Sequence, residues 1–421
     1  MPPRRLTPDE AVIEIAKRAK GERRVFIPGG CAEPLALREA WQKNPQTAAD
    51  LTFCGVFLPG VNAFDYSSLH ESARLDLFLM IPELRDALAK GRASLTPAHY
   101  SQVAHLIMAR EMSVAILHVS KQDGNKKCAF GLSADFGPTL IGRADYTIAL
   151  VNAQMPATEE APRMAINAAD AIVEIDEPLA TMDTPKPAAG AAAIAKRVAA
   201  MVRDDDVIQM GIGRLPTSIV SALKDKERLK IFSGMVSDAV LPLLDAGGIA
   251  DEPGAITTGA VIGSERLYER MGKEWRLKLM PVQHTHSYSV VSRIENLVAI
   301  NACLEVDLFG QVNAEFAGAQ QIASIGGLGD YVRGARAAPG GRAIVALHAE
   351  GKDETSRIVP RLPAGAVTLS RADAPIVVTE HGAVDLDGMD MIARAHALIH
   401  IAAPKHRDAL EEAWAKIRAK L

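Results

Sequence analysis

The feature that most constrains the fold is the alternation of short strand-like and helix-like segments along the chain. Arg24–Gly30 (RVFIPGG) is a β-branched and aromatic run that ends at glycines, and a helical pattern, Glu33–Lys43 (EPLALREAWQK), follows it. The same order returns at Val207–Gly213 (VIQMGIG) and Leu215–Lys226 (LPTSIVSALKDK). Such alternation predicts parallel sheets covered by helices, and therefore an α/β fold.

The two halves of the chain share a local pattern, which indicates two related domains. Val25–Trp41 aligns without gaps with Val207–Leu223, and each stretch contains a strand, a glycine turn, a proline five residues later and a helix. Thr184–Ala193, rich in Pro, Gly and Ala, reads as the linker. We expect two similar open α/β domains, residues 1–185 and 186–421, with the active site in the cleft between them.

The N-terminal segment predicts a capped helix and not a secretory signal. Thr7 is a suitable N-cap, Pro8 suits the first helical position, and Glu10 completes a capping box. The segment has no apolar core of the kind that a secretory signal needs.

Composition argues against several classes of partner. The net charge of −4 gives no reason to expect nucleic acid or an anionic membrane. No apolar run approaches the roughly 18 residues of a membrane span. The four cysteines are scattered without paired or zinc-ligand spacing, which is typical of thiols in a reducing compartment. We expect a cytoplasmic protein.

A carboxylate interrupts an apolar stretch near residue 305. Leu297–Ile300 is a continuous apolar run, typical of a strand covered on both faces. From Cys303 the pattern alternates, so that Glu305 and Asp307 share one face until Gly310 breaks the strand. A carboxylate at the end of a core strand lies exposed at the rim, is buried and paired, or performs chemistry. The residues alone leave these alternatives open.

Two later segments combine glycine with polar side chains. Ile325–Ala335 (IGGLGDYVRGA) has glycines that let a ligand approach backbone N–H groups, although a surface turn has the same composition. Val377–Gly388 (VVTEHGAVDLDG) places Glu380 and His381 at the end of a β-branched strand. With Glu305, these strand ends predict a ligand crevice at the carboxyl edge of one sheet.

Other chemistries have weaker support. His284 and His286 form an HxH pair that could chelate zinc from a strand, but no Asp, Glu or Cys nearby makes an evident third ligand. The chain has no GxSxG nucleophile elbow. The segment Gly211–Pro216 (GIGRLP) lacks the third glycine of a dinucleotide-binding turn. We therefore expect no metal and no dinucleotide.

The chain resembles the acetyl-CoA hydrolase/transferase family, which includes 4-hydroxybutyrate, butyrate and succinyl-CoA:acetate CoA-transferases. The motifs that carry the resemblance occur in the family's order over nearly the full length: QMGIGRLPTSIVSAL, GSERLYE, INACLEVDLFGQVNAE, GGLGDYVRGA, VVTEHGAVDLDG and LIHIAAPKHRDAL. Some positions depart from the family pattern, among them Gly234 in place of a glutamate and Ala403 in place of a histidine.

The resemblance implies an activity and a nucleophile. In proteins with this motif, the glutamate that matches Glu305 attacks an acyl-CoA thioester and forms an acyl-glutamyl anhydride, and then a glutamyl-CoA thioester. The expected function is transfer of CoA from an acyl-CoA to a short-chain carboxylic acid. Hydrolysis of acyl-CoA by the same glutamate and non-catalytic binding of acyl-CoA are the alternatives. The resemblance also implies a homodimer or a higher homo-oligomer.

The resemblance further implies which residues form the site. Residues expected to bind coenzyme A are His284, Thr285, His286, Gly326, Gly327, Gly329, Gly382 and Lys405. Residues expected to contact the remaining substrate are Gly211, Gly213, Asp330, Glu380 and His381.

Overall fold

The computed structural model describes residues 2–183, 190–363 and 365–421. The chain divides into two compact units. The first contains residues 1–184, 234–238 and 252–285, and the second contains 185–233, 239–251 and 286–421. The linker was predicted at residues 184–193, of which 184–189 lie outside the described residues. Its last two residues, 192 and 193, belong to helix α5 (Ala192–Ala199). The division at residues 185 and 186 stays a prediction.

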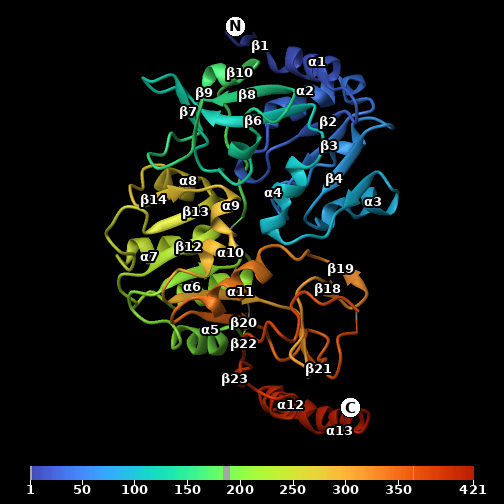
Figure 1. Cartoon of the computed structure of the whole chain (residues 1–421), viewed down its shortest axis with the longest axis vertical. Coiled ribbons are helices and arrows are strands. Elements are labelled where there is room, and N and C mark those ends of the chain that lie inside the picture. The colour runs from blue at the N-terminus through green and yellow to red at the C-terminus, as the bar shows by residue number, and fades with distance from the viewer. Residues whose placement is uncertain (1, 184–189, 364) are drawn as a thin grey trace. The chain divides into compact units, whose positions relative to one another are not determined.

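An eight-stranded sheet forms the centre of the first unit (Figure 1). All neighbouring strands in this sheet run parallel. In spatial order they are β1 (Arg4–Leu6), β10 (Ala171–Ile175), β8 (Tyr146–Asn152), β6 (Val114–Ser120), β2 (Arg24–Phe26), β3 (Thr52–Gly55), β4 (Arg74–Leu77) and β5 (Ala93–Leu95). Every residue of β6 and β8 is buried, as expected for the middle strands of a covered parallel sheet.

Helices with one apolar face supply part of the apolar core of the first unit. They are α1 (Pro8–Arg18), α2 (Leu35–Lys43), α3 (Arg85–Ala89), α4 (Tyr100–Met108), α8 (Glu265–Met271) and α9 (Val282–Thr285). The predicted capping box of α1 is confirmed, because the Thr7 side chain accepts from the Glu10 N–H and the Glu10 side chain accepts from the Thr7 N–H. In the core, Trp41 of α2 packs edge-on against Phe53 of β3, with ring centroids 5.1 Å apart.

A second eight-stranded sheet follows the order β14-β13-β12-β11-β15-β20-β22-β23. Strands β11, β15, β20 and β22 run parallel to one another, and β23 pairs antiparallel with β22. The bounds are β14 (Leu277–Leu279), β13 (Ile256–Val261), β12 (Lys230–Val236), β11 (Val207–Met210), β15 (Leu297–Ala302), β20 (Arg342–Ala346), β22 (Ile376–Thr379) and β23 (Gly382–Asp385). The prediction of an α/β fold with largely parallel sheets is confirmed.

Smaller elements complete the described chain. The remaining helices are α5, α6 (Arg214–Ser221), α7 (Leu241–Asp245), α10 (Tyr288–Val291), α11 (Leu328–Ala337), α12 (Met391–His400) and α13 (Arg407–Arg418), and the last two lie side by side (Figure 1). A three-stranded sheet contains β17 (Val312–Asn313), β16 (Glu305–Asp307) and β21 (Ile358–Val359). Two hairpins pair β7 (Lys127–Ala129) with β9 (Arg163–Ala165) and β18 (Phe316–Ala317) with β19 (Gln320–Gln321).

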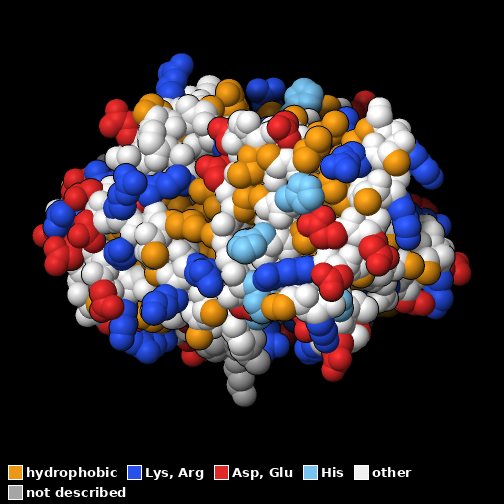
Figure 2. Space-filling model, turned by 90° about the horizontal axis from the view of Figure 1, so that it is seen from below, with side chains coloured by type: hydrophobic (Ala, Val, Ile, Leu, Met, Phe, Trp, Pro, Cys, Tyr) orange, Lys and Arg blue, Asp and Glu red, His pale blue; other side chains and the backbone are white. Residues whose placement is uncertain are grey.

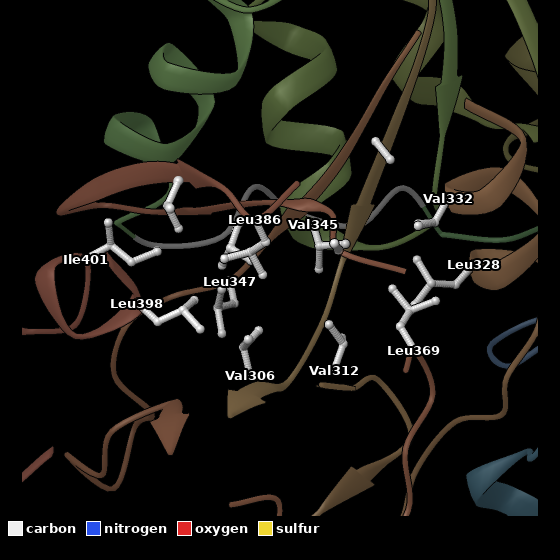
Figure 3. Packing of buried hydrophobic residues seen from close by; sticks show 14 of the residues in the cluster. Val306, Val312, Leu328, Val332, Val345, Leu347, Leu369, Leu386, Leu398 and Ile401 are labelled. Atoms are coloured by element: carbon white, nitrogen blue, oxygen red, sulfur yellow. The ribbon is translucent and has the colours of Figure 1, made fainter. Parts of the chain in front are cut away.

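One apolar cluster joins the small sheet to strands β15, β20 and β22 of the second large sheet. Val306 of β16, Val312 of β17 and Leu328 of α11 belong to it, together with Val345 of β20 and Leu398 of α12. Figure 3 shows these side chains around a common packed interior. Since the strand that starts at Glu305 and the helix that follows the glycine motif pack on the same core, the core holds both segments in place.

The surface view shows no separation of charges. On the face drawn in Figure 2, basic and acidic side chains are interspersed. Among the described residues, no helix combines the length and the apolar character that crossing a bilayer requires.

Candidate functional site

Glu305 begins a strand of the small sheet. The expectation that a single strand runs from residue 297 to Gly310 is wrong, because β15 ends at Ala302 and β16 starts at Glu305 in another sheet. Glu305 pairs with Asn313 across the antiparallel β16–β17 ladder, and the Leu304 N–H donates to the Asn313 carbonyl at 2.8 Å. The nucleophile candidate therefore lies at the start of a short hairpin strand outside the large sheet.

The Glu305 carboxylate is buried and has two polar neighbours. Only 7% of the residue is exposed. Asn313 Nδ2 donates to Glu305 Oε2 at 2.9 Å, whereas Arg357 Nη1 lies 3.9 Å from Oε1. One carboxylate oxygen is thus held by a short hydrogen bond, and the other faces a cation across a longer distance. Of the alternatives that the sequence left open for Glu305, exposure at the rim is wrong.

Backbone hydrogen bonds determine the orientation of the Asn313 amide. Its Oδ1 accepts from the N–H groups of Glu315 at 3.0 Å and Phe316 at 2.9 Å. Its Nδ2 also donates to the Phe316 carbonyl at 2.7 Å. A flipped amide would place Nδ2 against two N–H donors, so the group that faces Glu305 must be the donor.

Asp307 shares the face of Glu305 but has a structural environment. It is fully buried, and Asp307 Oδ1 accepts from the Phe309 N–H at 3.0 Å and the Gln311 N–H at 2.9 Å. Gln311 Nε2 donates to Oδ2 at 2.8 Å. Burial raises the pKa of Asp307, which these hydrogen bonds partly oppose. Asp307 therefore stabilises the turn before β17, and the structure separates the roles of the two carboxylates.

The glycine motif forms the start of α11. Gly326 has a φ of +56°, a left-handed conformation that favours glycine, and Gly327 is the N-cap residue. A Cβ on Gly327 would lie 2.7 Å from Nε2 of His286. His286 is buried and packs at 62° against Tyr331, with ring centroids 4.9 Å apart, and burial lowers its pKa to about 3. The structure thus brings together two of the predicted CoA residues, Gly327 and His286, whereas Gly329 and Asp330 lie in the first turn of the helix.

Gly211 and Gly213 form the turn between β11 and α6. The Gly211 N–H donates to the Ile300 carbonyl at 2.9 Å, and a Cβ at this position would lie 3.1 Å from Asn301 Oδ1. Gly213 has a φ of +115° and is the N-cap residue of α6. The backbone conformation of Gly213 therefore favours glycine, whereas a side chain at Gly211 would crowd Asn301.

Glu380 and His381 form the turn between β22 and β23, and Gly382 is the first residue of β23. Glu380 Oε2 accepts from the Ala349 N–H at 2.9 Å, and His381 is exposed. A Cβ on Gly382 would lie 2.7 Å from Cγ2 of Ile401. The carboxyl ends of β15 and β22 lie at the same edge of the sheet, because both strands run parallel to β20.

Lys405 lies in the short 3₁₀ turn Pro404–His406 and is half exposed. It forms ion pairs with Glu350 and with Glu354, the latter at 3.4 Å. These carboxylates raise the pKa of Lys405. The lysine is therefore held near the end of β20, where its charge is available to an anionic ligand only in competition with two carboxylates.

His284 and Thr285 belong to the first unit and His286 to the second. The expectation of a strand here is wrong: His284 and Thr285 form the end of α9, and His286 follows in a turn. The HxH pair therefore lacks the strand geometry on which the zinc alternative depended. Burial lowers the pKa of His284, and the nearby Lys278 adds to this effect.

Sequence reasoning missed Asn313 and Arg357. Asn313 could have been found from the GQVN segment, since a glycine turn five residues after Glu305 suggests a hairpin whose second strand faces the first. Arg357 has no such signal, because it precedes β21, more than fifty residues further along the chain.

Two family models match the chain in succession. Residues 5–183 match the acetyl-CoA hydrolase/transferase N-terminal domain, and residues 263–414 match the C-terminal domain of the same family. A curated relative, the 4-hydroxybutyrate coenzyme A transferase of Clostridium kluyveri, is 33% identical over 420 residues, which cover 98% of this chain and 97% of the relative. The chain belongs to the acetyl-CoA hydrolase/transferase family.

Solved structures agree with this family assignment. The crystal structure of RipA from Yersinia pestis superposes with a TM-score of 0.89 at 28% identity, covering 99% of this chain and 98% of RipA. The 4-hydroxybutyrate CoA-transferase from Porphyromonas gingivalis gives a TM-score of 0.78 at 26% identity, with coverage of 99% and 98%. The predictions of an acetyl-CoA hydrolase/transferase fold and of a CoA-transferase are confirmed. The roles of the site residues stay predictions.

Proposed function

We propose that this CoA-transferase moves CoA from an acyl-CoA to a short-chain carboxylic acid through covalent intermediates on Glu305. The observation that carries the proposal is the environment of that carboxylate. Glu305 is buried, Asn313 orients one of its carboxylate oxygens, and Arg357 Nη1 lies 3.9 Å from the other. The 4-hydroxybutyrate coenzyme A transferase of Clostridium kluyveri and the butyryl-CoA:acetate CoA-transferase of Anaerostipes caccae, the latter 32% identical over 352 residues, support the choice of short-chain acids.

In the first half-reaction, a Glu305 oxygen attacks the thioester carbonyl and CoA leaves as its thiolate, which yields an acyl-glutamyl anhydride. The thiolate then attacks the glutamyl carbonyl, so that the donor's acid leaves as its carboxylate and a glutamyl-CoA thioester remains. In the second half, the acceptor carboxylate attacks this thioester and expels the thiolate, which forms an anhydride between the acceptor and Glu305. The thiolate then attacks the acceptor's acyl carbonyl, and Glu305 leaves as a free carboxylate. No net proton is consumed, and the kinetics should be ping-pong.

The chain contains groups that could stabilise the negative charges formed in these reaction steps. Each attack places negative charge on a carbonyl oxygen, and a preorganised donor at such an oxygen is typically worth about 3–4 kcal/mol. When the glutamyl carbonyl is attacked, Asn313 Nδ2 and the Arg357 guanidinium are the nearest donor and cation to the two Glu305 oxygens. The N–H groups of the turn at Gly326 and Gly327 are candidates for the acyl carbonyl.

Trapping the intermediate tests the proposal. The protein is incubated with acyl-CoA, treated with borohydride or hydroxylamine, and mapped by peptide mass spectrometry. We expect the modification on Glu305, loss of turnover in Glu305→Ala and Glu305→Gln, and full activity in the exposed control Glu412→Gln. A label on Asp307 or Glu315 would move the nucleophile to that residue.

The acceptor dependence of CoA release separates transfer from hydrolysis. We expect acyl-CoA alone to release CoA slowly, and an added short-chain acid to be converted into its CoA thioester much faster. Equal rates of CoA release with and without acceptor, and no new thioester, would show an acyl-CoA hydrolase. Binding of acyl-CoA without either reaction would show a binding protein.

A further inference from the structure

Arg357 faces Glu305 across a gap that solvent reaches. Its Nη1 lies 3.9 Å from Glu305 Oε1, which is too long for a hydrogen bond. In the part of the chain that the structure describes, the guanidinium donates no hydrogen bond and Oε1 accepts none. Neither group belongs to the buried polar atoms that lack a partner, and the Arg357 side chain is 25% exposed. A small ligand can therefore reach both groups.

Backbone hydrogen bonds hold Arg357 beside the strand of Glu305. The Val306 N–H donates to the Arg357 carbonyl at 3.0 Å, and the Arg357 N–H donates to the Ala349 carbonyl at 2.9 Å. The Ala349 N–H in turn donates to Glu380 Oε2 at 2.9 Å. The backbone from which the guanidinium extends is thus fixed relative to Glu305, as a binding group requires.

Gly351 leaves the space in which the guanidinium lies. A Cβ at Gly351 would lie 2.6 Å from Arg357 Nη2 and 2.8 Å from Nε. Gly351 is not among the glycines with a positive φ, so glycine is needed here for space and not for its backbone angles. The same Cβ would lie 2.4 Å from Oδ1 of Asp353, which accepts from Thr355 Oγ1 at 2.8 Å. A larger residue at this position would therefore displace Arg357.

The charge opposite Arg357 changes during the proposed reaction. In the free protein, the guanidinium faces the Glu305 carboxylate. In the glutamyl-CoA thioester the Glu305 side chain is neutral, so the guanidinium loses this opposite charge. The next reactant is the acceptor acid, which is a carboxylate at pH 7. A guanidinium binds a carboxylate through two parallel hydrogen bonds, and its charge strengthens both of them.

We propose that Arg357 binds the carboxylate of the acceptor acid and holds it beside the glutamyl-CoA thioester, an inference that rests on the function proposed for Glu305. One acceptor oxygen then attacks the glutamyl carbonyl, the carbon–sulfur bond breaks, and CoA leaves as its thiolate. The free protein should bind the acid weakly, because the Glu305 carboxylate repels a second carboxylate. The acceptor site is therefore formed when the thioester forms.

Binding to the full-length Glu305→Gln variant tests the proposal without turnover. Glutamine is close to glutamate in shape and, like the thioester, carries no charge. The matched probes are butyrate and its uncharged analogue butyramide. Calorimetry at pH 7 should show that butyrate binds the variant at least about 10-fold more tightly than the wild type, whereas butyramide binds both alike. Equal binding of butyrate to the two proteins, or an equal gain for butyramide, would overturn the proposal.

Further substitutions in the Glu305→Gln background assign the gain to the guanidinium. Arg357→Leu should abolish it, and Arg357→Lys should keep part of it, because an ammonium retains the charge but not the paired donors. Gly351→Ala should reduce the gain by displacing the guanidinium, whereas Gly124→Ala, whose Cβ would meet open space, is the control. An undiminished gain in the leucine variant would refute the role of Arg357. If that variant does not fold, an undiminished gain in Gly351→Ala has the same meaning.

Trapping separates this inference from the proposed function. With Glu305 intact, Arg357→Leu should still be labelled on Glu305 by acyl-CoA alone, while its KM for the acceptor acid rises at least about 10-fold. A label on another residue would refute the function proposed for Glu305 and leave the calorimetric result for Arg357 unaffected. A labelled variant with an unchanged KM for the acceptor would refute the role of Arg357.

Discussion

At the scale of the residue, the proposed function depends on the different surroundings of two carboxylates in one strand. Asp307 accepts three hydrogen bonds from its own turn. Glu305 accepts one short hydrogen bond, from Asn313. A carboxylate whose lone pairs are engaged by the backbone is a poor nucleophile, because attack would break those bonds. We infer that Asn313 is a positioning residue for Glu305.

Asn313→Asp tests that role. The aspartate keeps an oxygen for the N–H groups of Glu315 and Phe316 but places its second oxygen against Glu305 Oε2 and the Phe316 carbonyl. Repulsion between the carboxylates favours sharing of a proton. We expect kcat at pH 7 to fall by roughly 10²-fold, with little change in KM for acyl-CoA, and the acidic limb of the pH–kcat profile to move to higher pH. An unchanged kcat and profile would contradict the inference.

The ionisation of Asp135 predicts a pH-dependent stability. Burial raises its pKa to about 7 in the folded protein from near 3.8 when unfolded, so the folded state binds this proton more tightly. Proton binding by Asp135 therefore contributes fully to the free energy of unfolding below about pH 4. This contribution, at most about 4 kcal/mol, is lost as the pH rises to 7. Asp135→Asn cannot titrate. Calorimetric melting temperatures of the variant and the wild type should therefore diverge in favour of the variant between pH 4 and 7. A difference in melting temperature that stays constant from pH 4 to pH 7 would contradict the raised pKa of Asp135.

At the scale of the element, the short break after β15 places Glu305 outside the large sheet. Cys303 and Leu304 redirect the chain, and Val306 returns the next strand to the apolar core. The chain also changes direction at the glycine motif, where Gly327 is the N-cap residue of α11 and lies against the ring of His286. A larger side chain at Gly327 would displace this ring or the turn.

Gly327→Ala should destabilise the protein through that ring. The new Cβ would lie 2.7 Å from His286 Nε2, and the ring is confined by Tyr331. Overpacking of this kind costs about 1–3 kcal/mol. Denaturant unfolding should show that cost, and the double variant with His286→Ala should recover part of it as a coupling energy. Gly124→Ala, whose Cβ would meet open space, is the control. Equal effects of the two alanine substitutions would contradict the steric argument.

At the scale of the whole molecule, chain order and compact units do not coincide. Residues 252–285 belong to the first unit although they follow the predicted boundary. Within that unit, the Val261 N–H donates to the Leu132 carbonyl and the Ala134 N–H to the Gly259 carbonyl, each at 2.8 Å. These hydrogen bonds and the wall that β13 gives to a small cavity of this unit come from the C-terminal half of the sequence.

A fragment of residues 1–185 should therefore be less stable than the same residues in the full chain. It lacks the partners of Leu132 and Ala134 and exposes the apolar side of the segment between Phe130 and Phe136. Amide hydrogen exchange should be faster in that segment of the fragment, while the amides of β6 and β8 change less. Equal protection of the segment in the fragment and the full chain would show that residues 1–185 fold independently.

Local sequence was sufficient to predict the alternation of strands and helices, the capped helix at Thr7, the glycine turns after the strands and, through its motifs, the family. These features depend on neighbours within a few residues, where hydrophobic periodicity and turn chemistry act. This reasoning failed at His284, where a strand was expected and the structure has a helix. The helix has only four residues, which is too short to show a clear periodicity.

Only the tertiary structure decided which polar groups meet. Arg357 lies near Glu305 because β21 pairs with β16, and His118 and Asp135 line one cavity because β6 and the segment after β7 come together. Such contacts join residues that are 17 to 52 positions apart in the chain. The free energy of packing and strand pairing determines these contacts. That free energy depends on the whole core, and local sequence patterns do not show which distant segments meet there.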